Sequence, residues 1–225
     1  MWVKICGIRD VETAIQIAKA GADAVGLNFY TKSVRFVTRQ TARNIVSALP
    51  AEVAKVGVFV NSSAAEIEDV ARATGLTAVQ LHGDESAEVV AEVRQLLPEI
   101  RLIRAWRVGS EGLAPLVEHC VDCRQHGGVW DACLVDARVE GNYGGTGATA
   151  PWELLAGEWS LHALPPLILA GGLTVENVAQ AVCKVHPWGI DVATGVESSP
   201  GAKNLELVRQ FLEQARAAEG TACRP

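Results

Sequence analysis

The sequence predicts an α/β fold, a single (β/α)8 or TIM barrel, on three observations. Eight short runs of apolar, often β-branched residues are spaced along the 225-residue chain. The segments between them have apolar residues at helical spacing. The strand-then-helix units average roughly 28 residues, which is typical of parallel sheets with right-handed crossovers, and eight such units close a barrel. A doubly wound open sheet is the competing architecture.

The expected strands alternate with the expected helices along the whole chain. Each strand is short and continuous in its apolar character, as is usual when both faces of a parallel sheet are covered. In chain order, the strands are expected over residues 3–8, 23–29, 55–60, 77–83, 101–106, 131–137, 166–171 and 189–194.

Several of the helices have recognisable start signals. Apolar residues over 11–18 lie on one helix face, and Asp10 is the expected N-cap of this first helix. The third helix is predicted to start at a capping box over residues 63–66. Residues 175–182 have the same periodicity, and Thr174 is the expected N-cap there.

The sixth unit departs from the regular spacing of the other units. Its strand is followed by a long glycine-rich loop over residues 137–151, before a helix that includes residues 152–155. No internal repeat, low-complexity tract or linker divides the chain. Residues 1–225 are therefore expected to form one domain, with residues 219–225 as a flexible tail.

Composition and charge restrict the partners. The longest apolar runs are too short to cross a bilayer, and the N-terminus lacks a signal pattern, so we expect a cytoplasmic protein with no membrane partner. The formal charge of −6, without a Lys/Arg cluster, argues against nucleic acid as a partner. A local pocket for a small phosphorylated substrate is compatible with this charge. The sequence leaves a monomer or a homodimer open.

The six cysteines are expected to be free thiols, as is usual in a chain without a secretion signal. One close pair, Cys120 and Cys123, could form a zinc site with His126, but no second CxxC or His pair completes a tetrahedral ligand set. Buried thiols on a helix face are the preferred interpretation. The five histidines are too scattered for a metal-dependent epimerase, so neither a metal nor another cofactor is expected.

In a barrel, function resides at the C-terminal ends of the strands, which directs attention to Cys6 and Asp136. Because strand side chains alternate, Lys4 and Cys6 share a face, and the lysine is expected to lower the pKa of the thiol. Asp136 at the end of the sixth strand could serve as a general acid. The alternatives are a buried, inert thiol and a carboxylate that caps a loop amide.

Other strand ends suggest ligand-binding groups. Gln80 and His82 share one face, and His82 could position a substrate or merely bond a loop carbonyl. Arg35, after the second strand, is the leading candidate for a bidentate carboxylate clamp, with a solvated loop residue as the alternative. Glycine turns over residues 170–173 and 193–196 are typical of phosphate sites in barrels, although tight turns alone also need glycine.

The ordered motifs resemble those of one family, the phosphoribosylanthranilate isomerases of tryptophan biosynthesis. They include VKICGIRD, GADAVGLNFY, KSVRFV, VGVFVN, VQLHG, LVD with GGTG, LAGGL and DVATGVE with SPGAK, and the resemblance covers nearly the whole chain. It implies a (β/α)8 barrel that converts N-(5-phosphoribosyl)anthranilate into 1-(2-carboxyphenylamino)-1-deoxyribulose 5-phosphate by an Amadori rearrangement.

The resemblance also implies roles for individual residues. Cys6 would be the general base and Asp136 the general acid, while Arg35 would meet the anthranilate carboxylate. The phosphate would be bound by Gly172, Thr194 and Gly195.

The chain departs from the usual family pattern at Ala148, at residues 150–152 and at Asn204. These departures affect loop closure and a secondary carboxylate interaction rather than the proton-transfer groups. A different phosphosugar isomerase or epimerase and a catalytically silent phosphoribosyl-binding barrel are the competing functions.

Overall fold

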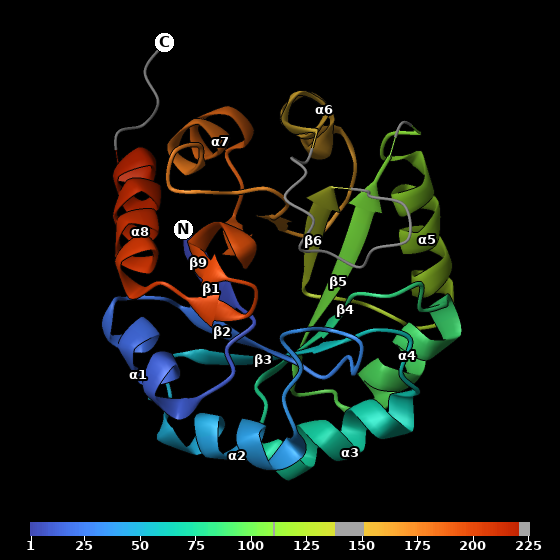
Figure 1. Cartoon of the computed structure of the whole chain (residues 1–225). Helices are drawn as coiled ribbons and strands as arrows, with labels where there is room; N and C mark the ends of the chain where they lie inside the picture. The colour runs from blue at the N-terminus through green and yellow to red at the C-terminus, as the bar shows by residue number, and fades with distance from the viewer. Residues whose placement is uncertain (110, 138–150, 221–225) are drawn as a thin grey trace.

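Eight parallel strands form a closed barrel in the order β1 to β8, with helices around it (Figure 1). The structure is a computed structural model, which describes residues 1–109, 111–137 and 151–220. The strands are β1 (Trp2–Cys6), β2 (Ala24–Asn28), β3 (Ala54–Phe59), β4 (Ala78–Leu81), β5 (Arg101–Val108), β6 (Ala132–Ala137), β7 (Leu167–Leu169) and β8 (Gly189–Val192).

The helices follow the strands one by one, as the sequence predicts. They are α1 (Val11–Lys19), α2 (Arg39–Ala48), α3 (Ala64–Thr74), α4 (Ala87–Leu96), α5 (Ala114–Gln125), α6 (Trp152–Glu158), α7 (Val178–Val185) and α8 (Leu205–Gly220). Short 3-10 helices, η1 (Trp159–Leu161) and η2 (Thr194–Val196), follow α6 and β8. A small antiparallel hairpin, β9 (Glu197–Ser199) and β10 (Ala202–Lys203), precedes α8.

The helix starts follow the predicted signals in two of three cases. Asp10 accepts a hydrogen bond from the Thr13 amide, and the Ser63 side chain accepts one from the Glu66 amide. Thr174 is not the N-cap of α7. The helix starts three residues later because Thr174 opens a turn, and Asn177 occupies the cap position.

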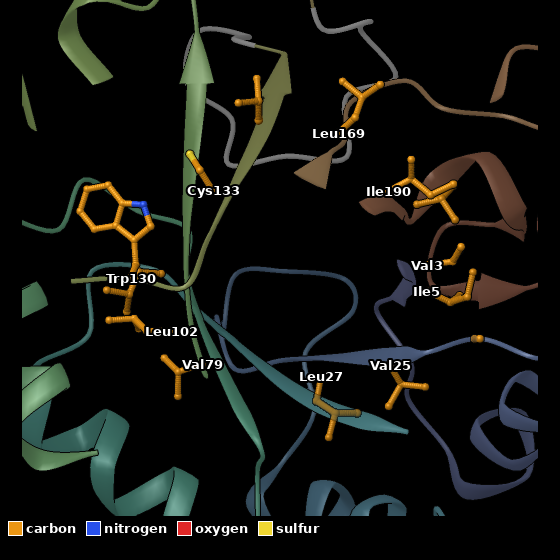
Figure 2. Packing of buried hydrophobic residues seen from close by; sticks show 14 of the residues in the cluster. Val3, Ile5, Val25, Leu27, Val79, Leu102, Trp130, Cys133, Leu169 and Ile190 are labelled. Atoms are coloured by element: carbon orange, nitrogen blue, oxygen red, sulfur yellow. The ribbon is translucent and has the colours of Figure 1, made fainter. Parts of the chain in front are cut away.

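The apolar residues form two layers separated by the barrel wall. Outward-facing strand residues pack against the helices, and Figure 2 shows part of this layer, with Val3 and Ile5 of β1 near Ile190 of β8. Each such buried side chain contributes about 1.5–3 kcal/mol to folding. Small and branched residues fill the barrel itself, among them Ala24, Val56, Ala78, Ile103, Leu134 and Ile168. Alternation along β1 therefore turns Lys4 and Cys6 inward, as the sequence predicts.

Two further expectations need correction. Glu219 and Gly220, placed in the expected tail, belong to α8, and Glu219 pairs with the N-terminal amine of Met1. Cys6, Cys120, Cys123 and Cys133 are free thiols as predicted, but Cys183 is disulfide-bonded. The loop at 138–150, including Ala148 and the GGTG motif, and residues 221–225 with Cys223 lie outside the described residues.

The described part of the chain contains no helix that is both long and apolar enough to cross a bilayer. Within the same residues, no three His, Cys, Asp or Glu side chains come together as a metal-binding group. Cys123 faces His119, with 3.5 Å between Sγ and Nε2, whereas Nδ1 of His126 lies 2.9 Å from the carbonyl oxygen of Asp122. The predicted zinc alternative therefore lacks its geometry.

Candidate active site

Cys6 lies at the C-terminal end of β1 and is half-buried. Parallel pairing places it opposite Gly26 of β2. A Cβ atom on Gly26 would lie 2.6 Å from Sγ of Cys6 and 3.0 Å from its Cα. Since real Cβ atoms do not approach other atoms so closely, glycine at this position creates the space that the thiol occupies.

A buried ion pair lies directly below the thiol. Nζ of Lys4 donates to Oδ1 of Asp191 at 2.9 Å, and the two side chains are 0% and 9% exposed. Strand pairing explains the contact, because Lys4 of β1 is aligned with Asp191 of β8. Asp191 and Cys6 raise the pKa of Lys4 by more than burial lowers it, so the ammonium stays charged inside the barrel.

The electrostatics of the thiol differ from the expectation. Burial raises the pKa of Cys6, and the nearby positive charge of Lys4 only partly offsets that effect. Asp191 also raises the pKa, which further opposes the contribution of Lys4. The predicted net lowering of the pKa is therefore wrong, although the predicted neighbour and the direction of its own contribution are right.

Asp136 is the penultimate residue of β6 and is 7% exposed. Nε2 of His82 lies 3.8 Å from its Oδ2 atom, just beyond hydrogen-bond distance. Gln80 stands behind this histidine, with 2.7 Å between its Nε2 and Nδ1 of His82. Because an amide nitrogen donates, Nδ1 accepts and the ring proton lies on Nε2, facing the carboxylate.

His82 is electrically neutral in this environment. Burial lowers its pKa to about 3, with smaller contributions from the positive charges of Lys4, Arg107 and Arg104. Its Nε2 atom is buried and has no hydrogen-bond partner among the described residues. The imidazole is therefore a neutral donor directed toward Asp136, and Gln80 contacts this histidine from the other side of the ring.

A cavity of about 290 Å³ connects Asp136 with the turns after β7 and β8. Small and apolar residues make up most of its lining, with the two carboxylates of Asp136 and Asp191 and no Lys or Arg among the described residues. The lining contains Asp136, Gly172, Thr174, Asp191, Thr194 and Gly195, among others. The structure thus brings the predicted acid and all three predicted phosphate-binding residues to one cavity.

The two turns hold each other in place. A Cβ atom on Gly195 would lie 1.9 Å from the carbonyl oxygen of Leu173, so only glycine permits this close approach. Asn177 secures the other turn, because its side chain accepts a hydrogen bond from the Thr174 amide and donates one to the Gly172 carbonyl. Gly172 has a φ of +61°, in the left-handed region that favours glycine.

Arg35 is present at the site, but its bidentate contact is with a residue of the chain itself. Its Nε and Nη2 atoms donate to the two carboxylate oxygens of Glu197, both at 2.7 Å. Nη2 also donates to Oγ1 of Thr194 at 3.1 Å. The predicted bidentate clamp for a ligand is therefore already occupied in this geometry, and Nη1 carries the donors that no described residue uses.

Four residues at the site were not expected from the sequence: Asp191, Glu197, Lys203 and Arg107. Arg107 is aligned with Asp136 in the β5–β6 register, and its Nη1 donates to the His82 carbonyl at 3.2 Å. The alternation of β5 and β8 could have indicated that Arg107 and Asp191 point inward. Glu197 and Lys203 carry no such local signal, because their positions depend on the hairpin after β8.

Comparison with known proteins gives a consistent result. A family model described as "N-(5'phosphoribosyl)anthranilate (PRA) isomerase" matches residues 3–214. An N-(5'-phosphoribosyl)anthranilate isomerase of Nostoc punctiforme is 39% identical over 97% of this chain and 100% of its own. One from Pseudomonas paraeruginosa is 43% identical over 96% of this chain and 95% of its own.

Solved structures agree in fold. The phosphoribosyl anthranilate isomerase of Thermotoga maritima superimposes with a TM-score of 0.83 at 36% identity, covering 96% of this chain and 99% of its own. A phosphoribosyl anthranilate isomerase in complex with reduced 1-(o-carboxyphenylamino)-1-deoxyribulose 5-phosphate has a TM-score of 0.79 at 35% identity, with the same coverage of both chains.

Proposed function

The chain belongs to the N-(5'-phosphoribosyl)anthranilate isomerase family and is an isomerase of tryptophan biosynthesis, and we propose that Cys6 and Asp136 carry its two proton transfers. The observation that supports this assignment most strongly is the cavity that joins Asp136 to the turns at Gly172 and Gly195. Cys6, on the inward face of β1, completes the site above the Lys4–Asp191 pair.

Asp136 acts first, as the general acid. It protonates the ribose ring oxygen of N-(5-phosphoribosyl)anthranilate, the C1'–O bond breaks, and the anthranilate nitrogen supplies the electron pair that forms an iminium. The carboxylate left on Asp136 gains a neutral partner in His82, whose Nε2 proton faces it from 3.8 Å. Gln80 fixes this tautomer by donating to Nδ1.

The thiolate of Cys6 then acts as the general base. It removes the proton from C2', and the electron pair of the C2'–H bond neutralises the iminium to give an enolamine, which tautomerises to the ketone. Lys4 supports this step, because its positive charge favours the thiolate over the thiol. The raised pKa of Cys6 makes the thiolate a strong base and also reduces its abundance near neutral pH.

The remaining contacts hold the two ends of the substrate. Backbone N–H groups of the turns that contain Gly172, Thr194 and Gly195 bind the phosphate, since the described lining of the cavity offers no cationic side chain. Arg35 meets the anthranilate carboxylate through Nη1. The protein then takes a small phosphorylated substrate, works in the cytoplasm as a monomer or homodimer, and needs no cofactor.

The fluorescence of the anthranilate group provides the test. Purified wild-type chain should convert the substrate, while variants at Cys6 and Asp136 should bind the reduced product analogue without turnover. Retained turnover in either variant would remove that residue from the mechanism.

A further inference from the structure

We propose that Glu197 is a positioning residue that determines which edge of the Arg35 guanidinium meets the ligand carboxylate. The inference rests on the proposed role of Arg35. It concerns how the enzyme recognises the carboxyl group on the aromatic ring of its ligand. Arg35 contacts this carboxylate, and Glu197 acts on the recognition indirectly, by orienting Arg35.

The donor count of Arg35 supports this inference. A guanidinium has five N–H donors. Glu197 takes the Nε donor and one donor of Nη2, each at 2.7 Å, and Oγ1 of Thr194 takes the other Nη2 donor at 3.1 Å. Among the described residues, the two donors of Nη1 are the ones without a partner. A ligand carboxylate must therefore approach Nη1.

Glu197 is itself held by a second cation. Nζ of Lys203 lies 2.6 Å from Oε1 of Glu197 and donates to the Ala193 carbonyl at 2.9 Å. The side chains of Glu197 and Lys203 are 2% and 1% exposed. Hydrogen bonds from Arg35 and Lys203 outweigh the effect of burial and lower the pKa of Glu197 to about 2, so it remains a carboxylate at working pH.

The backbone also restrains the arginine. Arg35 passes over Gly7, where a Cβ atom would lie 2.4 Å from its Cδ. Gly7 has a φ of +82° and directly follows Cys6, so the arginine stem crosses the chain beside the thiol. With its stem restrained at Gly7 and one edge held by Glu197, the guanidinium presents Nη1 as the nitrogen that no described residue contacts.

The test compares two ligands on the full chain. One is reduced 1-(o-carboxyphenylamino)-1-deoxyribulose 5-phosphate, and the other is the same molecule without its carboxyl group. The ratio of their dissociation constants, measured by calorimetry, isolates carboxylate recognition. Arg35→Met should reduce the wild-type preference for the ligand with the carboxyl group by roughly tenfold to a hundredfold, as expected for a charge-assisted hydrogen bond.

Glu197→Gln should reduce the same ratio by at least about fivefold, because the amide cannot accept from both Arg35 nitrogens. It should raise KM more than it lowers kcat. Glu197→Asp, which keeps the charge but shortens the side chain, is the second variant in case Glu197→Gln folds poorly. We expect the ratio of dissociation constants in Glu197→Asp to lie between the value in Glu197→Gln and the wild-type value.

Glu85→Gln is the matched control, because Arg104 and Glu85 form another buried Arg–Glu pair, with 3.0 Å between Nη1 and Oε2 and exposures of 2% and 1%. This control should lower the melting temperature and leave the ligand ratio unchanged. If the ratio stays at the wild-type value in folded Glu197 variants but falls in Arg35→Met, the positioning role of Glu197 is wrong and the proposed role of Arg35 stands. A ratio that survives Arg35→Met would reject the proposed role of Arg35 and the inference with it.

Discussion

Lys4 and Asp191 form an ion pair inside the barrel, with 2.9 Å between Nζ and Oδ1, directly below the thiol of Cys6. Each carboxylate or ammonium buried in this way is costly unless it is paired. The pair therefore keeps a positive charge next to the thiol in a place where an isolated lysine would be deprotonated. This relationship links the stability of the barrel to the chemistry at its rim.

Lys4→Met tests that link. The substitution leaves Asp191 buried without its cation and should destabilise the fold by ~3–5 kcal/mol in denaturant unfolding. It should also raise the pKa of Cys6 further, because the positive charge that lowers it is removed. Lys55→Met is the control: Lys55 is 5% exposed and its Nζ contacts the Pro50 carbonyl, away from Cys6. The pH dependence of Cys6 alkylation reports the pKa of the thiol. An equal change of this pKa in both variants would contradict the proposed role of Lys4.

The pH dependence follows from the raised pKa of the thiol. Because Cys6 must be a thiolate to act as base, kcat/KM should increase with pH through neutrality and level off only above the reference value of 9.0. Stability has the opposite slope: a raised pKa in the folded state stabilises the fold at low pH, and this contribution is lost as pH rises through that pKa. A pH–rate profile that is flat from pH 6 to 9 would argue against the thiolate.

Removing the proposed proton-transfer groups should affect turnover and not folding. Cys6→Ser and Asp136→Asn change few atoms, yet each should reduce kcat by about 10²–10⁴-fold, the usual contribution of general acid–base catalysis. Steady-state fluorescence of the anthranilate group gives the rates, and circular dichroism tests the fold. A folded Asp136→Asn enzyme with a wild-type rate would require a different acid.

Gly26→Ala should displace the thiol without removing it. The new Cβ would lie 2.6 Å from Sγ and 3.0 Å from Cε of Lys4, so both side chains must move. A displacement of about 1 Å typically costs on the order of 10²-fold in rate, and we expect kcat to fall with little change in KM. Gly157→Ala is the matched control, because its added methyl group would have no described atom within 4 Å apart from its chain neighbours and its own helix backbone. Equal rates for the two alanine variants would show that the thiol tolerates the contact.

His82 should remain neutral throughout the working pH range. Burial lowers its pKa to about 3, so its imidazole NMR signals should not titrate between pH 5 and 8. A lowered pKa in the folded state stabilises the protein above the usual histidine value of 6.5, and this stabilisation is lost as pH falls toward 3. His82→Gln should abolish that part of the acid dependence. A chemical-shift titration with a midpoint near 6.5 would contradict a neutral donor beside Asp136.

The sequence by itself was sufficient for the order of strands and helices and for the inward face of β1, although not for the start of α7. Strand alternation correctly turned Lys4 and Cys6 into the barrel, and the count of strand–helix units correctly predicted a closed barrel. Glycine turns after the last two strands marked the cavity that Gly172 and Gly195 line. These predictions hold because a two-residue repeat and a glycine requirement are properties of the chain segment itself.

Tertiary structure decided what each charged group meets. Pairing of β1 with β8 brought Asp191 to Lys4, and together with burial this reversed the expected direction of the Cys6 pKa. The hairpin after β8 brought Glu197 to Arg35, which gave the predicted clamp a partner before any ligand arrives. Electrostatic energies depend on distance and desolvation between residues that are 162 or 187 positions apart in the chain, and no local pattern encodes those quantities.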